Sequence, residues 1–220
     1  MVRVISCSLS ILIVGLLFAS IAHADEDAEW IDLLQDNDLS QHWTTEGNWS
    51  IDDEGVVSLV PREGERGWTR YRSYLWLDGE YIDFEFEFDY VVQRRGNSGL
   101  FFHVDNKDSA VTHGIEVQIF DSGSKPMDAV LNNHDAGGII PGPPPTTNAA
   151  NPAGEWNHFH IRCQGNDLTV TLNGEVVNQI KLDHLQLTNG NIIERPDHGS
   201  IGFQDIAKPL LLRNIRIREL

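Results

Sequence analysis

The sequence predicts an all-β fold in which two antiparallel sheets pack face to face as a sandwich. In residues 83–90 acidic and aromatic side chains alternate strictly, and this period of two is typical of a strand with one solvated face and one core face. Asn173-Gly174 separates two segments of strand composition, and this dipeptide is the strongest short-range signal for a β-hairpin. The chain shows no internal repeat and no long amphipathic helix. We therefore expect residues 25–220 to form a single β-sandwich domain.

The individual strands are short segments rich in β-branched and aromatic residues, each bounded by turn residues. In chain order they are expected at residues 49–51, 56–59, 83–90, 97–103, 114–121, 156–163, 168–172, 175–177, 200–204 and 211–217.

One long segment, residues 132–154, interrupts this series of strands. It is rich in Gly, Pro, Asn and Ala and contains Pro143-Pro144-Pro145. Such a composition disfavours ladder hydrogen bonds, so we expect a long surface loop without strand pairing. The loop follows the strand at residues 114–121 and could form one wall of a site, with His134 at its start. An exterior loop without a function is the equal alternative.

The N-terminal segment has the organisation of a secretory signal peptide. Arg3 precedes an apolar run at residues 11–18, and Ala22-His23-Ala24 is a small-x-small cleavage pattern. The apolar run is too short to cross a bilayer comfortably. We expect a signal peptide over residues 1–24 and a mature protein in the periplasm or outside the cell. Cys163 is then the one cysteine left, which we interpret as a small buried apolar residue.

The charge of the chain restricts its partners. The sequence has 33 acidic and 16 basic residues and a formal net charge of −17. An acidic surface repels phosphate backbones and anionic lipid headgroups, so we expect neither a nucleic acid nor, after signal cleavage, a membrane as a partner.

The strand at residues 114–121 carries the most informative polar pattern. Successive side chains of a strand point to opposite faces, so Glu116, Gln118 and Phe120 share one face. The opposite face is formed by Ile115, Val117 and Ile119. A carboxylate and an amide backed by an apolar layer are expected in a polar site on a sheet.

The strand at residues 97–103 contributes to the same region. Its alternation predicts that Phe101 and His103 point to one face and Leu100 and Phe102 to the other. A carboxylate, an amide and an imidazole would then meet on one concave surface.

His158 and His160 form a second candidate pattern, because they are two residues apart on one predicted strand. Zinc-binding strands use this spacing, but no third ligand lies nearby in the sequence. We interpret the two histidines as outer-face residues, and the existence of a metal site stays open.

Seven short motifs occur in an order that makes a family resemblance specific, and they span the whole mature chain: Tyr81–Glu85, Asn97–Phe102, Glu116–Asp121, Ala153–Asn157, Leu172–Gly174, Ile201–Gln204 and Arg213–Ile217. Together they resemble the 3-keto-disaccharide hydrolase domain family. The resemblance implies a jelly-roll sandwich of the concanavalin A-like lectin/glucanase type, with a sugar cleft on a concave inner sheet. It also implies activity on sugars or glycosides that are oxidised at C3.

The residues suit one reaction of such sugars better than ordinary hydrolysis. Retaining glycosidases need two close carboxylates, whereas this strand face offers Glu116 alone, since Asp121 points to the other side. A C3 ketone acidifies the C2 hydrogen, so one base can remove it and expel the C1 substituent by elimination, and water then adds. Glu116 is the expected base, and His103 or His134 is the expected proton donor.

Other residues are expected to bind the substrate. Gln118 and Gln204 would donate hydrogen bonds to the developing enolate, and Asn97, Phe101 and Phe120 would contact the sugar. No cofactor is required, although a divalent cation could replace one enolate donor.

Three functions stay open at this point. The first is an exported enzyme that cleaves C3-oxidised glycosides, and the second is a non-catalytic carbohydrate-binding module of the same fold. The third is a structural or protein-binding sandwich, which a flat or filled concave face would favour.

Overall fold

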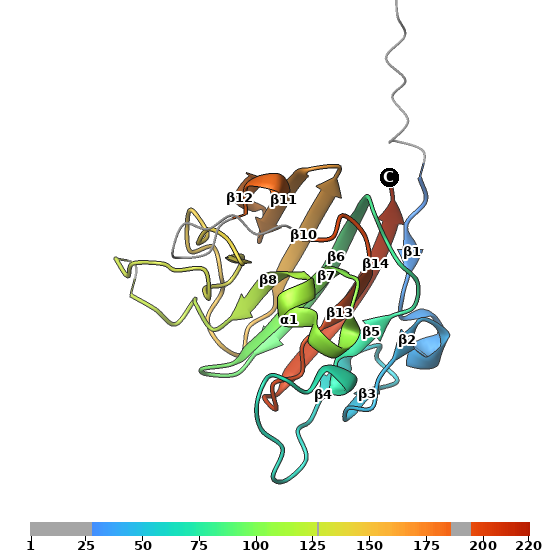
Figure 1. Cartoon of the computed structure of the whole chain (residues 1–220). Helices are drawn as coiled ribbons and strands as arrows, with labels where there is room; N and C mark the ends of the chain where they lie inside the picture. The colour runs from blue at the N-terminus through green and yellow to red at the C-terminus, as the bar shows by residue number, and fades with distance from the viewer. Residues whose placement is uncertain (1–27, 127, 186–194) are drawn as a thin grey trace, which may run out of the picture.

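The computed structural model describes residues 28–126, 128–185 and 195–220. Two antiparallel sheets pack face to face, and the only α-helix in the described residues is the single turn α1 (Ala110–His113) (Figure 1). The predicted all-β sandwich is therefore confirmed. The predicted signal peptide, residues 1–24, lies outside the described residues.

Sheet A contains eight strands, and β1 (Ile31–Asp32) pairs with β14 outside the main order. The main order across the sheet is β12 (Glu175–Lys181), β11 (Asp167–Leu172), β10 (Asn157–Gln164), β6 (Phe84–Val92), β14 (Leu210–Glu219), β4 (Val57–Leu59) and β3 (Trp49–Ile51).

Sheet B contains six strands and carries the candidate site on the face that points away from sheet A. Its order is β2 (Trp43–Thr44), β5 (Leu75–Leu77), β13 (Ser200–Phe203), β7 (Asn97–Val104), β8 (Ile115–Phe120) and β9 (Ile139–Ile140). Short 3-10 turns connect the strands at η1 (Gln35–Asn37), η2 (Leu39–Gln41), η3 (Tyr71–Ser73), η4 (Lys107–Ser109) and η5 (Leu182–His184).

Aromatic residues of β6 form the centre of the core between the sheets. Phe88 is fully buried, and its ring centroid lies 4.9 Å from that of Phe203 in sheet B and 5.4 Å from that of Phe159. The next core residue along β6, Tyr90, stacks on Phe159 at 5.3 Å. The period of two predicted for residues 83–90 thus places one aromatic side chain after another against the opposite sheet.

The acidic residues of β6 point outward, as the alternation predicts, and they are paired. Glu85 accepts hydrogen bonds from Arg162 Nε at 2.9 Å and Arg218 Nη2 at 2.9 Å. Its Oε2 also lies 3.0 Å from His160 Nε2, and Asp89 Oδ1 lies 2.8 Å from His158 Nδ1. The two histidines are therefore outer-face partners of carboxylates. Among the described residues, no group of three or more His, Cys, Asp or Glu side chains could hold a metal ion.

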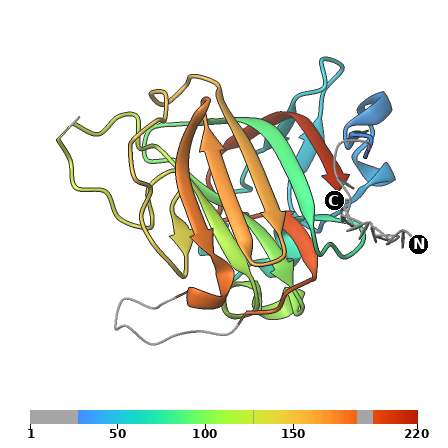
Figure 2. The same ribbon diagram turned by 90° about the horizontal axis from the view of Figure 1, so that it is seen from above.

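The expectation that residues 132–154 make no ladder hydrogen bonds is wrong. Ile139 and Ile140 form β9 and pair with Val117 and Glu116 at the edge of sheet B. Two further backbone bonds of 2.9 Å join Gln118 to the turn Gly137-Gly138. Figure 2 shows the yellow-green and yellow segment that contains β9 extending beyond the sandwich. A two-residue strand at an edge needs few donors, which is why proline and glycine on either side do not prevent it.

None of the helices in residues 28–126, 128–185 and 195–220 is long and apolar enough to cross a membrane.

Replacing Phe88 by Ala should lower the free energy of unfolding by about 3 to 5 kcal/mol, because the side chain contacts aromatic rings of both sheets and leaves a cavity. Urea unfolding followed by circular dichroism measures this. The control is Ile82→Ala, since Ile82 is 62% exposed and its removal should change stability by less than about 0.5 kcal/mol. Equal effects of the two substitutions would contradict the placement of the core.

Candidate functional site

A pocket of about 280 Å³ opens on the face of sheet B that points away from the core. Its lining comes from strands β7, β8 and β9, from α1, and from the segments before η3, before β9 and after β13. It consists of Trp68, Asn97, Val111, Glu116, Gln118, His134, Ile140, Gln204 and Ile206. This volume lies just below the usual range of small-molecule sites. It suits a ligand of about one sugar ring.

Glu116 is the one carboxylate in the lining of this pocket. The alternation of β8 turns it away from the core residues Ile115 and Val117, yet it is only 5% exposed. No described group donates a hydrogen bond to its carboxylate. Because burial disfavours the charged form, the pKa of Glu116 is raised from 4.5 to about 8. The side chain is thus a desolvated and unpaired acid with access to a ligand.

Gly99 makes the space that Glu116 occupies. It lies on β7 directly opposite Gln118, and a Cβ atom at this position would lie 2.0 Å from Glu116 Oε1. Any other residue would therefore displace the carboxylate. Sequence analysis gave Gly99 no role, although a glycine inside a strand often marks a place where another group approaches closely.

Three amide side chains line the same pocket as the carboxylate. Gln118 is 1% exposed, and its Nε2 donates to Asn97 Oδ1 at 3.0 Å, which fixes both side chains. The backbone N–H of Gln204 donates to Gly99 O at 2.9 Å, so the residue after β13 is held beside β7. The three predicted amide residues, Asn97, Gln118 and Gln204, therefore line the same pocket as Glu116.

His134 also lines the pocket, from the start of the segment 132–154. Its side chain is exposed, so the imidazole lies at the mouth rather than at the floor. The adjacent Asp135 is fully buried and holds the loop, since it accepts 2.9 Å bonds from Ser122 Oγ and from the backbone N–H of Asn132. The Lys125 ammonium contributes to holding the pKa of Asp135 below its usual value.

The expected position of His103 is wrong. The pairing of β7 with β13 shifts register between Ser200 and Gly202, and His103 adopts a positive φ of 51°. The shift turns the imidazole into the interior, where Nε2 lies 2.8 Å from Ile82 O and 3.9 Å from Cys163 Sγ. Burial lowers the pKa of His103. Phe101 and His103 therefore do not share a face, and His103 does not line the pocket.

Two aromatic residues expected to contact the sugar are also outside the lining. Phe101 is 1% exposed and is covered by Tyr74, with ring centroids 5.7 Å apart, in a second small cluster that includes Trp76 and Ala110. Phe120 is half-buried at the far end of β8, where Lys125 Nζ lies 5.8 Å from its ring centroid. Cys163 is fully buried, as interpreted from the sequence, and burial raises the pKa of its thiol.

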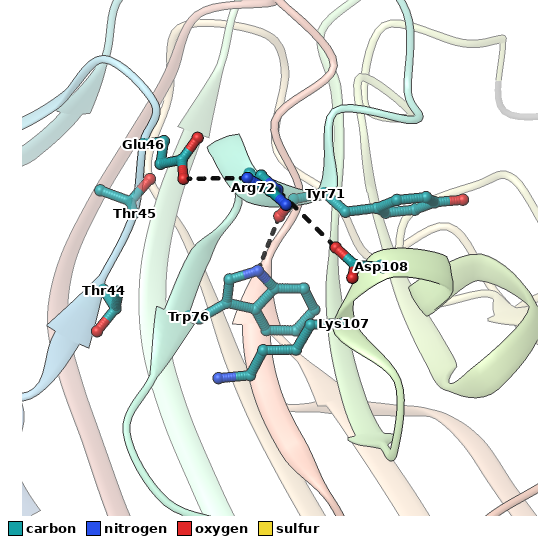
Figure 3. A pocket seen from close by; sticks show the side chains of 8 residues that line it. All are labelled: Thr44, Thr45, Glu46, Tyr71, Arg72, Trp76, Lys107 and Asp108. Carbon is teal, nitrogen blue, oxygen red and sulfur yellow. Dashed lines mark hydrogen bonds and ion pairs between the residues drawn. The ribbon is translucent and has the colours of Figure 1, made fainter.

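A smaller pocket of about 180 Å³ lies near β2 and β5 at the other end of sheet B (Figure 3). Its two carboxylates, Glu46 and Asp108, both face the guanidinium of Arg72, at 3.8 Å and 4.0 Å. Trp76 donates its indole N–H to Tyr71 O at 2.8 Å, and Lys107 covers its ring. Each acid of this pocket has a charged partner, unlike Glu116.

Solved structures share this fold at low sequence identity. Two structures described as putative glycosyl hydrolases from Parabacteroides distasonis are 24% and 20% identical, with TM-scores of 0.71 and 0.70. Each match covers 87% of this chain. It covers 100% of the first solved chain and 94% of the second. The carbohydrate binding module CBM66 from Bacillus subtilis is 15% identical with a TM-score of 0.54, over 81% of this chain and 96% of its own. No curated protein matches the sequence.

The family comparison agrees with the resemblance that the ordered motifs predict. The family described as the 3-keto-alpha-glucoside-1,2-lyase-like domain matches residues 29–218, which is nearly all of the described chain. The chain belongs to the family of 3-keto-alpha-glucoside-1,2-lyase-like domains.

Proposed function

We propose that this protein cleaves the glycosidic bond of sugars oxidised at C3, by elimination followed by addition of water. The observation that carries the proposal is Glu116, a desolvated carboxylate without a hydrogen-bond partner in a pocket for about one sugar ring. Membership of a glycosyl hydrolase-like family supports a carbohydrate as the ligand.

Glu116 begins the reaction as the base. Its carboxylate takes the C2 proton, and the electrons of the C2–H bond move toward C3 and give an enolate oxygen. When the ketone re-forms, the electrons make a C1–C2 double bond and the C1–oxygen bond breaks. Water then adds to C1 and the proton returns to C2, so that the net change is hydrolysis of the glycosidic bond.

The neighbouring amides stabilise the charge that develops on the substrate. The side-chain amides of Asn97 and Gln204 line the pocket and can donate to the enolate oxygen, while Gln118 holds Asn97 in place. His134 is the imidazole in the lining and supplies a proton to the departing oxygen at the mouth.

The same proposal includes export through the segment at residues 1–24. Because Ala22-His23-Ala24 fits a signal-peptidase site, the secreted protein should begin at Asp25. N-terminal sequencing of protein from the culture medium or the periplasm measures this. Full-length chain retained in the membrane fraction would contradict it.

Glu116→Gln should reduce turnover of a 3-keto glucoside by more than about 100-fold, because it removes the base and preserves the shape of the side chain. Affinity for the substrate should change little. The matched control is Asp121→Asn, which is similarly buried and accepts a 2.8 Å bond from the Arg95 N–H outside the pocket. Product analysis by chromatography and calorimetric binding separate the two effects.

Two outcomes would change the proposal. Near wild-type turnover by Glu116→Gln would exclude Glu116 as the base. Binding of 3-keto glucosides by the wild type without any turnover would favour a non-catalytic carbohydrate-binding module.

The rate should depend on pH through Glu116. A base must be deprotonated, so the limb of the kcat/KM profile that Glu116 controls should rise as the pH approaches about 8. The free energy of unfolding should change with pH in the opposite direction. The pKa of Glu116 is raised in the folded state, so between pH 4.5 and about 8 the folded protein keeps a proton that the unfolded chain releases. The free energy of unfolding therefore decreases as the pH rises through this range. Glu116→Gln should remove this loss, which thermal unfolding at several pH values measures. The absence of a limb of kcat/KM that rises toward pH 8 would contradict Glu116 as the base.

A further inference from the structure

Trp68 differs from the other residues of the pocket because it is a large apolar ring that is exposed. It is the one Phe, Tyr or Trp side chain in the lining and is 53% exposed, whereas Glu116 and Gln118 are almost fully buried. A single exposed apolar side chain needs no explanation by itself. An indole in the lining of a pocket, however, offers a flat apolar face on which a ligand can pack. The neighbouring Trp76 offers no such surface, since it is 4% exposed and its ring is covered by Lys107 (Figure 3).

The backbone around Trp68 is fixed to the pocket rather than free in solvent. The Tyr74 hydroxyl donates to Trp68 O at 2.8 Å. Two residues further along, Arg70 Nη2 lies 2.7 Å from Glu65 Oε1 and 3.1 Å from Asp205 Oδ2. The Asp205 side chain is fully buried, so this ion pair is shielded from solvent.

The ion pair joins the Trp68 segment to other residues of the pocket. Asp205 lies between Gln204 and Ile206, and both of these line the pocket together with Trp68. The loop between β4 and η3 is therefore tied to the chain segment that brings Gln204 to the site. The backbone that carries the indole is therefore held beside the pocket, while the ring itself is exposed.

We propose that Trp68 stacks against the leaving group of the substrate and makes the protein selective for glycosides whose C1 substituent contains a ring. This inference rests on the proposed function. The ring that reacts must present C2 to Glu116, which is buried, and the pocket holds about one ring. The substituent at the adjacent C1 must then project to the mouth, from which it departs. The C–H face of a sugar ring, or an aryl ring, packs well on an indole.

The test compares two substrates with the same reacting ring, methyl 3-keto-α-glucoside and a 3-keto disaccharide with a glucosyl leaving group. Trp68→Ala should lower kcat/KM for the disaccharide about tenfold, mainly through KM, and change that for the methyl glycoside less than about twofold. Trp68→Phe should restore most of the loss. Trp30→Ala is the matched control, because it removes an indole outside the pocket. The Trp30 ring lies beside sheet A, with its centroid 4.5 Å from Arg216 Cζ. Trp30→Ala should leave kcat/KM unchanged for both substrates.

Binding measured in the Glu116→Gln background tests the same inference without turnover. Calorimetry should show that Trp68→Ala weakens binding of the disaccharide about tenfold and leaves binding of the methyl glycoside almost unchanged. Equal losses for both sugars, or no loss, would overturn the role of Trp68 and leave the proposed function intact. Turnover of neither sugar by the wild type, with the selective loss of binding still present, would overturn the proposed function alone. If neither sugar binds, both proposals fail.

Discussion

The candidate site depends on the burial of one carboxylate without a counter-charge. Two other buried acids have cationic partners, since Glu85 contacts Arg162 and Arg218, and Asp205 contacts Arg70. A third, Asp121, accepts the backbone N–H of Arg95. Pairing with His160 and Arg218 keeps the pKa of Glu85 below its usual value, whereas burial alone raises that of Glu116 to about 8. A buried acid without a partner destabilises the folded state once it ionises, so its presence in a pocket points to function more than to structure.

Much of this arrangement follows from local sequence. A strand has a period of two, so the residues of β8 assign Ile115 and Val117 to the core and Glu116 and Gln118 to the other face. The same rule places the aromatic residues of β6 inside and its acids outside. Asn173-Gly174 fixes the β11–β12 hairpin, and both residues adopt the positive φ values, 51° and 84°, that such a turn requires.

The errors come from contacts between parts of the chain that are distant in sequence. His103 changes face because β7 and β13 pair with a register shift, and no pattern within residues 97–103 reveals it. Phe101 faces the expected side but is covered by Tyr74, which comes from a separate segment. Trp68 reaches the site through the Arg70–Asp205 ion pair, which joins residues 135 positions apart. Gly99 alone had a local signal, a glycine inside a strand.

The raised pKa of Glu116 also explains why a single carboxylate suits elimination better than displacement. Proton transfer from carbon is faster when the pKa of the base is closer to that of the acid, and desolvation strengthens a carboxylate as a base. A nucleophilic carboxylate in a retaining glycosidase needs a second acid about 5 Å away, and no other carboxylate in the described residues lines this pocket. In the proposed reaction, the ketone of the substrate supplies the activation that a second acid provides in a retaining glycosidase. Under this proposal the protein needs only to desolvate its base, hold the sugar ring through the amides of Asn97 and Gln204, and leave the C1 substituent free at the mouth.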